Sequence, residues 1–196
     1  ETNSTSCEDK TVGSTAGAAG IGRAMVDTFC AAGSTVHVAD LPGRGEGLPE
    51  GVGFSGVDVS DPADVDRLFD EATTHMGTVD VLCNNVGIAP MDSYLPAHEL
   101  PKASWDQIIA VNLTSYYLMT KYCIPHIKAR GGGAIINVSS VSASAPTPVE
   151  AIYGAAKAGV HSLTESFARA YGPTVRVNCL QPGPFLTAVS THWPAS

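Results

Sequence analysis

The stretch STAGAAGIGRA, residues 14–24, joins a short predicted strand to a predicted helix. Three glycines, Gly17, Gly20 and Gly22, fall inside this turn. Residues without side chains let a phosphate group approach the backbone amides at the N-terminus of a helix. The turn therefore predicts a nucleotide-binding loop, with a tightly packed strand-to-helix turn as the alternative.

Short apolar runs alternate with helical patterns along the rest of the chain. This alternation is typical of repeated βαβ units around a parallel sheet, and so predicts an α/β fold. The segment 41–53 is rich in glycine and proline where a crossover helix is expected, so at best a short helix is predicted there. The predicted strands cover 11–15, 35–40, 52–59, 79–85, 134–140 and 175–180, and the two longest predicted helices cover 105–127 and 152–171.

The composition limits the kinds of partner. A chain of 196 residues with a net charge of −8 has no cluster of Lys and Arg to meet nucleic acid or an anionic membrane. The 5 cysteines are scattered and have no metal-ligand spacing, so no disulfide framework and no metal site are predicted. No apolar run approaches the ~20 residues of a membrane span. We expect one cytoplasmic domain that acts on a small molecule and binds neither nucleic acid nor membrane.

Asp40 ends the second predicted strand. A carboxylate at this place can accept hydrogen bonds from the ribose hydroxyls of an adenosine and would repel a 2′-phosphate, which favours NAD over NADP. The alternative is an ordinary turn residue before Leu41 and Pro42.

Two tyrosines are each followed four residues later by a lysine. Tyr153 and Lys157 form one pair, and Tyr117 and Lys121 form the other. On a helix, residues four apart share a face, so either pair could serve one site.

The serine that precedes each tyrosine separates the two pairs. Ser104 and Tyr117 belong to one helical pattern and would lie about 20 Å apart. Ser140 instead ends a strand, and a loop returns the chain to the helix that carries Tyr153, so the two side chains can meet at the carboxyl edge of a parallel sheet. We therefore favour Ser140, Tyr153 and Lys157 as one site, with Tyr117 and Lys121 as a helix surface pair.

Together these motifs resemble the short-chain dehydrogenase/reductase family, in its ordinary rather than extended branch. The resemblance covers about residues 10 to 190 and implies a Rossmann-type doubly wound parallel sheet of about six strands with helices on both faces. It further implies hydride transfer between NAD(H) and a secondary alcohol or ketone. The matching motifs are STAGAAGIG, Asp40, VDVS with Asp58, NNVG at 84–87, Asn112, Ser140, YGAAK and PGPFLT at 182–187.

The resemblance also implies roles for single residues. Tyr153 would be the general acid/base, Lys157 would lower its pKa and hold the nicotinamide ribose, and Ser140 would orient the carbonyl. Asn112 would be a link in a proton relay, or would simply bond backbone groups. The implied cofactor-binding positions are Thr15, Gly17, Gly20, Ile21, Gly22, Asp40, Asp58, Val59, Asn84, Gly87, Pro182, Gly183 and Thr187, together with Tyr153 and Lys157.

Two departures from the family pattern bear most directly on function. Ala16 stands where the pattern has a glycine, which costs about 1 kcal/mol if that position needs a positive φ. The chain also stops at Ser196, so we expect a single domain, 1–196, without the family's usual C-terminal strand and helix. The helices at 105–127 and 152–171 remain available for a homodimer or homotetramer.

These departures leave an alternative function open. A shortened lid and an altered glycine turn would suit a catalytically silent module that binds a nucleotide or a partner. An intact set of Ser140, Tyr153 and Lys157 argues against that alternative. The substrate cannot be identified from the sequence, and Glu150 in the expected pocket is either a contact for a hydroxyl or amine or an ordinary loop charge.

Overall fold

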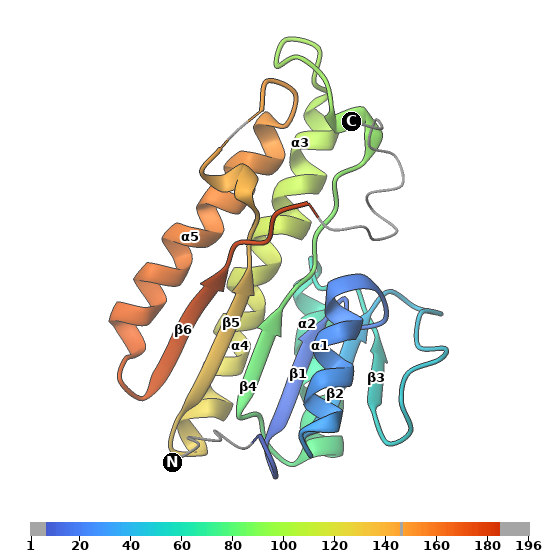
Figure 1. Ribbon diagram of the computed structural model, residues 1–196, viewed down its shortest axis with the longest axis vertical. Helices are drawn as coiled ribbons and strands as arrows, with labels where there is room; N and C mark the ends of the chain where they lie inside the picture. The colour runs from blue at the N-terminus through green and yellow to red at the C-terminus, as the bar shows by residue number, and fades with distance from the viewer. Residues whose placement is uncertain (1–6, 146, 185–196) are drawn as a thin grey trace.

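The protein is built around a single parallel sheet. A computed structural model describes residues 7–145 and 147–184. Its six strands pair in the order β3-β2-β1-β4-β5-β6, and every pairing is parallel (Figure 1). The predicted Rossmann-type sheet is confirmed. The strands are β1 (Thr11–Thr15), β2 (Thr35–Asp40), β3 (Gly53–Gly56), β4 (Val81–Asn84), β5 (Gly133–Val138) and β6 (Val175–Leu180).

Helices cover both faces of the sheet, as predicted. Alternate strand residues point to opposite faces, and they divide the core accordingly. One face packs against α1, and the other packs against α2, α4 and α5. The helices are α1 (Gly20–Ala31), α2 (Pro62–Met76), α3 (Lys102–Ile109), α4 (Ser115–Ala129) and α5 (Ala151–Tyr171). None of these described helices is both long and apolar enough to cross a bilayer.

The helix predicted at 105–127 has an interruption that the sequence did not indicate. A π-helical turn, Ala110–Thr114, lies between α3 and α4, and the backbone stays helical through it. The segment 41–53 contains turns and no helix, which agrees with its glycine and proline content.

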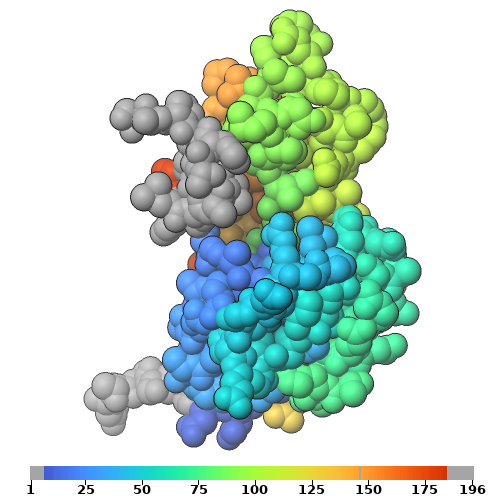
Figure 2. Space-filling view, turned by 90° about the vertical axis from the view of Figure 1, so that its right-hand side faces the viewer, coloured from blue at the N-terminus to red at the C-terminus, as the bar shows by residue number. Residues whose placement is uncertain are grey.

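Two polar residues of the first strand, Thr11 and Thr15, have specific partners. The backbone N and the hydroxyl of Thr11 donate to one carboxylate oxygen of Asp80, each at 3.0 Å. At the other end of the strand, the hydroxyl of Thr15 accepts from the backbone N of Asn85 at 2.9 Å and of Val86 at 3.1 Å. Thr15 therefore fixes the start of the loop that follows β4. Figure 2 shows this green segment rising above the blue and cyan first half of the chain.

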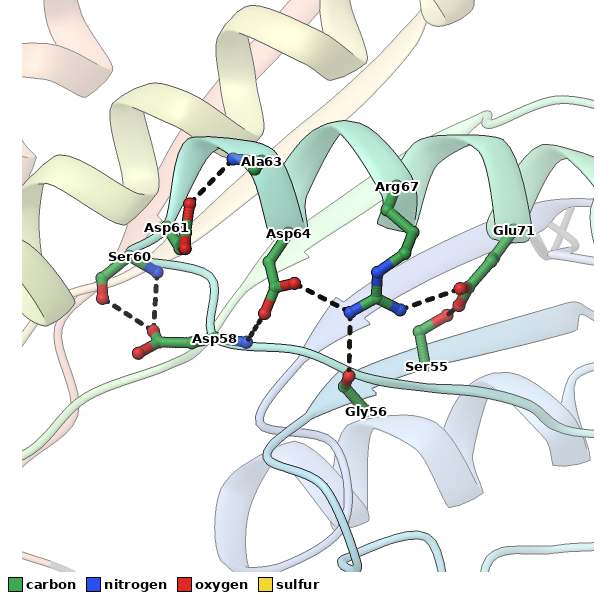
Figure 3. A network of polar contacts seen from close by, with 9 residues as sticks. All are labelled: Ser55, Gly56, Asp58, Ser60, Asp61, Ala63, Asp64, Arg67 and Glu71. Atoms are coloured by element: carbon green, nitrogen blue, oxygen red, sulfur yellow. Dashed lines mark hydrogen bonds and ion pairs between the residues drawn. The ribbon is translucent and has the colours of Figure 1, made fainter.

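A chain of polar contacts holds α2 beside β3 (Figure 3). Arg67 donates to Asp64 and Glu71, each at 2.8 Å, and to the carbonyl of Gly56 at 3.2 Å. Asp61 caps the helix by accepting from the backbone N of Ala63 at 2.9 Å. These contacts fix the ends of the segment that leads from β3 into the helix.

The same chain of contacts continues inward to a buried histidine. Ser55 donates to Glu71, so its oxygen accepts the hydrogen bond from Nε2 of His37 at 2.9 Å. Nδ1 of His37 then keeps its lone pair and has no partner among the described residues. Burial, together with the nearby His75, lowers the pKa of His37 to about 4.

Acid is therefore expected to weaken the fold through His37. An unfolded histidine takes up its proton near pH 6.5 and the folded one near pH 4, so the unfolded chain binds the extra proton between these values. Stability present above pH 6.5 should fall by about 3 kcal/mol as the pH drops to 4. Urea unfolding at several pH values measures this slope. His37→Gln should flatten the slope, and equal slopes in the two proteins would contradict the assignment.

Candidate functional site

The glycine turn lies at the carboxyl end of β1 and has little room for side chains. A Cβ on Gly22 would lie 2.1 Å from the carbonyl oxygen of Ala16, and one on Gly17 would lie 2.9 Å from the side chain of Val38. Gly20 has a φ of 55°, which favours glycine. Three predicted glycines are thus required by the geometry of the turn, and their backbone amides lie at the start of α1.

Ala16 adopts the strained backbone that the sequence comparison with the family pattern suggested. Its φ is 50°, in the left-handed region, and its backbone N donates to the carbonyl of Ala39 at 2.8 Å. A residue with a Cβ is disfavoured there. The turn keeps its shape in spite of this cost because the backbone N of Ala16 is bonded to β2 and its carbonyl accepts from Nδ2 of Asn85.

Ala16→Gly is expected to stabilise the protein by about 0.5–1 kcal/mol, because glycine adopts this backbone without strain. Urea unfolding measures the change. Ala24→Gly, on the exposed side of α1, is the matched control and should destabilise by about 1 kcal/mol. A loss of stability in Ala16→Gly would show that the alanine is not strained.

Asp40 lies beside this turn with its carboxylate buried. Its two oxygens accept from the backbone N of Ala18 at 3.2 Å and of Leu41 at 2.8 Å, and Nη1 of Arg44 lies 3.9 Å away. The carboxylate thus contacts the glycine turn itself. Asp40 therefore provides a negative charge at the end of β2, where the sequence predicts the ribose of an adenosine.

Two of the positions assigned to the cofactor have a different role in the structure. Asn84 donates to the side chain of Asn137 at 3.0 Å inside the sheet, and Val59 is 5% exposed within the core. The contact with the glycine turn comes from Asn85, whose Nδ2 donates to the carbonyl of Ala16 at 3.3 Å. Sequence reasoning missed Asn85, although it stands in the same NNVG motif. The side chain of Asn84 is directed toward β5 in this structure, and its support of the loop stays a prediction.

Asp58 contacts its own segment. Its Oδ1 accepts from the backbone N and the hydroxyl of Ser60, and its own backbone N donates to Asp64 at 2.8 Å. The carboxylate lies on an exposed loop after β3 (Figure 3). The structure therefore leaves Asp58 accessible at the carboxyl edge of the sheet.

Asn112 lies in the π-helical turn with its side chain fully buried. Its Oδ1 accepts from the backbone N of Ile88 at 3.1 Å, and its Nδ2 donates to the carbonyls of Ile88 at 2.9 Å and Ile108 at 3.2 Å. A Cβ on Gly87 would lie 3.0 Å from Oδ1 of Asn112 and 3.4 Å from Nζ of Lys157. Asn112 thus holds the loop after β4, and Gly87 leaves the space that this requires.

Ser140, Tyr153 and Lys157 come together as predicted. The side chain of Ser140 lies close enough to that of Tyr153 to influence its pKa, and Nζ of Lys157 lies 5.8 Å from the centre of the Tyr153 ring. Ser140 also contacts the hydroxyl of Ser142 at 3.3 Å, and Ser142 in turn donates to Glu150 at 3.3 Å. The residues converge because Ser140 follows the end of β5 at Val138 and Tyr153 lies in the first turn of α5, which begins at Ala151.

The pKa values of the site differ from the expectation. Burial raises the pKa of Tyr153, although the side chain of Ser140 opposes that rise. Burial lowers the pKa of Lys157 to about 7. The sequence predicts that Lys157 lowers the pKa of Tyr153. The structure instead gives Tyr153 a raised pKa. Lys157 directs its Nζ to Tyr116 and to the carbonyl of Val138, each at 3.0 Å.

The residues after β6 close one side of the site. The carbonyl of Pro182 accepts from the backbone N of Val141 at 3.0 Å, next to Ser140. Gly183 has open space around its Cα. Thr187 lies outside the described residues.

Comparison with known proteins decides the family. A family model described as short chain dehydrogenase matches residues 10–196. The chain belongs to the short-chain dehydrogenase/reductase family. The cis-4-hydroxycyclohexanecarboxylate dehydrogenase of Sinomonas cyclohexanicum is 35% identical over 189 residues, which are 92% of this chain and 75% of that protein.

Solved structures support the same family. Aldohexose dehydrogenase of Thermoplasma acidophilum, in ligand-free form, superimposes with a TM-score of 0.87 at 33% identity. The matched region is 93% of this chain and 69% of the aldohexose dehydrogenase chain. The 3-ketoacyl-(acyl-carrier-protein) reductase of Brucella melitensis, complexed with NADH, gives a TM-score of 0.88 at 31% identity over 94% of this chain and 79% of its own. This short-chain dehydrogenase is therefore an oxidoreductase.

One further residue of this short-chain dehydrogenase reaches the site and was missed. Tyr116 is 1% exposed, and its hydroxyl accepts a hydrogen bond from Lys157, the lysine that the sequence pairs with Tyr153. Its neighbour Tyr117, which the sequence singled out as the competing tyrosine, is 45% exposed on the helix surface. The only signal in the sequence was the pair of adjacent tyrosines one helical turn after Asn112.

Proposed function

We propose that the protein is an NAD(H)-dependent oxidoreductase that interconverts a secondary alcohol and a ketone. The observation that carries this proposal is that Ser140, Tyr153 and Lys157 meet at the same sheet edge as the glycine turn and Asp40. Ligands of parallel α/β sheets bind at this edge. The glycine turn suits the phosphates of a dinucleotide, and an acid/base group lies at the same edge. This combination suits a nicotinamide cofactor.

The residues present fit such a cofactor. A Cβ at Gly22 would fill the turn, and the buried carboxylate of Asp40 suits ribose hydroxyls rather than a 2′-phosphate. Bound nicotinamide would supply the hydride donor or acceptor. The proposed contacts with it come from the turn, from Asp40 and from Lys157, while Pro182 and Gly183 border the same site.

Tyr153 is proposed to hold the proton that the substrate oxygen gains or loses. A tyrosine with a raised pKa is a poor base near pH 7, so catalysis needs a positive charge close to its hydroxyl. The protonated Nζ of Lys157 supplies that charge. Ser140 offers a hydrogen bond to the substrate oxygen, where charge changes during the reaction.

Asn112 is proposed to hold the loop at Ile88 rather than to pass protons with its own amide. Both polar atoms of that amide already have backbone partners. This contact keeps the loop in place next to Lys157.

A homodimer through α4 and α5 is part of the proposal. An open groove lies between these helices, and it is lined by apolar and small residues. Tyr117 is exposed beside it. A second copy could cover this face without touching the site. The lining residues are Leu113, Thr114, Tyr117, Gly159, Ser162 and Leu163.

The proposal is tested by titrating the protein with NADH and, separately, NADPH, with nicotinamide fluorescence as the signal. We expect saturable binding with a preference for NADH, followed by NAD⁺-dependent oxidation of some secondary alcohols. Binding of neither cofactor would favour the alternative of a catalytically silent module.

A further inference from the structure

Tyr116 extends from α4 into the space beneath the site. Its side chain is 1% exposed, and its hydroxyl oxygen has three partners. The carbonyls of Val86 and Val138 lie 2.9 and 2.8 Å away, and Nζ of Lys157 lies 3.0 Å away. Nζ is also 4.8 Å from the centre of the Tyr116 ring, closer than the 5.8 Å to the ring of Tyr153.

The hydrogen-bond roles around this hydroxyl are fixed by its partners. A phenol has one proton to donate, and both carbonyls can only accept. The Tyr116 proton therefore goes to Val86 or Val138, and its oxygen accepts from Nζ of Lys157. Nζ donates in addition to the carbonyl of Val138 at 3.0 Å. A protonated amine has three N–H groups, so one N–H remains for a ligand or for Tyr153.

Lys157 lies among titratable side chains that are neutral when protonated. Among residues 7–145 and 147–184, the titratable groups that face it are Tyr116 from α4, Tyr153 from its own helix and Cys179 from β6. Burial lowers the pKa of Lys157 to about 7, and Cys179 opposes this change. Burial also raises the pKa of Tyr116 well above its usual value, so Tyr116 stays a neutral acceptor. Its hydroxyl therefore supports the protonated lysine without adding a charge.

We propose that Tyr116 is a positioning residue that directs Nζ of Lys157 and helps to keep this buried amine protonated. The inference rests on the function proposed above, because it concerns the lysine that assists Tyr153. The side chain of Tyr116 is buried, and its hydroxyl is bonded to Nζ of Lys157 and to the carbonyls of Val86 and Val138, so its effect on the reaction is exerted through Lys157. The lysine is thus shared between a structural tyrosine beneath it and the acid/base tyrosine beside it.

Tyr116→Phe removes the hydroxyl and keeps the ring. One acceptor of the charged amine is lost, so the pKa of Lys157 should fall by about one unit. The direct measurement is an NMR titration of the protein labelled with ¹³C at lysine Cε, without any cofactor. Lys157→Met identifies the signal. In activity assays, the alkaline limb of the pH profile of kcat/KM should move to lower pH by a similar amount.

Tyr122→Phe is the matched control, because it removes a hydroxyl from the same helix at a partly buried residue that packs against Phe69 of α2. It should change neither the NMR titration nor the pH profile. An unchanged Lys157 pKa in a folded Tyr116→Phe protein would overturn the proposal. If Tyr116→Phe does not fold, 4-fluorophenylalanine at position 116 fills the space of the hydroxyl with a very poor acceptor and should give the same shift. Failure of the wild type to bind NADH would count against the proposed function alone, since the titration uses no cofactor.

Discussion

Tyr153→Phe is expected to lower kcat by about 100- to 10,000-fold, the usual contribution of a general acid/base group. The variant keeps the ring and loses the hydroxyl that is proposed to exchange a proton with the substrate oxygen. NADH binding should change little, because the glycine turn and Asp40 lie at other strands. Steady-state kinetics with an alcohol substrate, together with the fluorescence titration, separates the two effects.

Tyr122→Phe serves as the control for this variant also, since both remove one hydroxyl. It should retain full activity. A Tyr153→Phe protein that keeps more than about a tenth of the wild-type kcat would remove Tyr153 from the acid/base role and would direct attention to a water-mediated proton transfer instead.

Asp40→Asn is expected to reduce the preference for NADH over NADPH by about 100-fold. A carboxylate about 4 Å from a 2′-phosphate costs roughly 1–4 kcal/mol for each unit of phosphate charge, and every 1.4 kcal/mol is tenfold in affinity. Removal of the charge removes this repulsion. The ratio of the two dissociation constants, measured by the fluorescence titration at fixed salt, gives the result.

The same variant should weaken both complexes somewhat. The carboxylate accepts from the backbone amides of Ala18 and Leu41, and an asparagine can accept from only one of them. The ratio is therefore the informative quantity. Asp61→Asn is the control, because asparagine also caps a helix and this position lies on the exposed start of α2. An unchanged ratio in Asp40→Asn would show that cofactor choice is made elsewhere, for instance at Arg44.

The parts of the site that could be predicted from the sequence depend on local geometry. A glycine turn between a strand and a helix has few solutions, and a strand end leading into a helix brings Ser140 next to Tyr153 over a short loop. The parallel pairing of the strands then follows from the alternation of strand and helix. These relations need no knowledge of the remaining packing.

The missed features depend on contacts between distant segments. Tyr116 reaches Lys157 across 41 positions of sequence, and no period within α4 indicates which of two adjacent tyrosines is buried. Asn84 and Asn85 differ by one position on a strand, which sends one side chain into the sheet and the other to the glycine turn. The pKa values of Tyr153 and Lys157 likewise reflect burial, which a motif does not contain.

The π-helical turn at Ala110–Thr114 makes the spacing of this helix part of the site. Each residue of an α-helix advances the chain by about 100° around the axis, and a π turn accommodates one more residue than an α turn. Deleting a single residue there would restore regular α geometry and rotate Asn112 and Tyr116 relative to each other. The loop at Ile88 and the amine of Lys157 could then not both keep their partners. The helix should thus tolerate many substitutions but no change of length between residues 108 and 116, so single-residue indels in this stretch would be absent from functional variants.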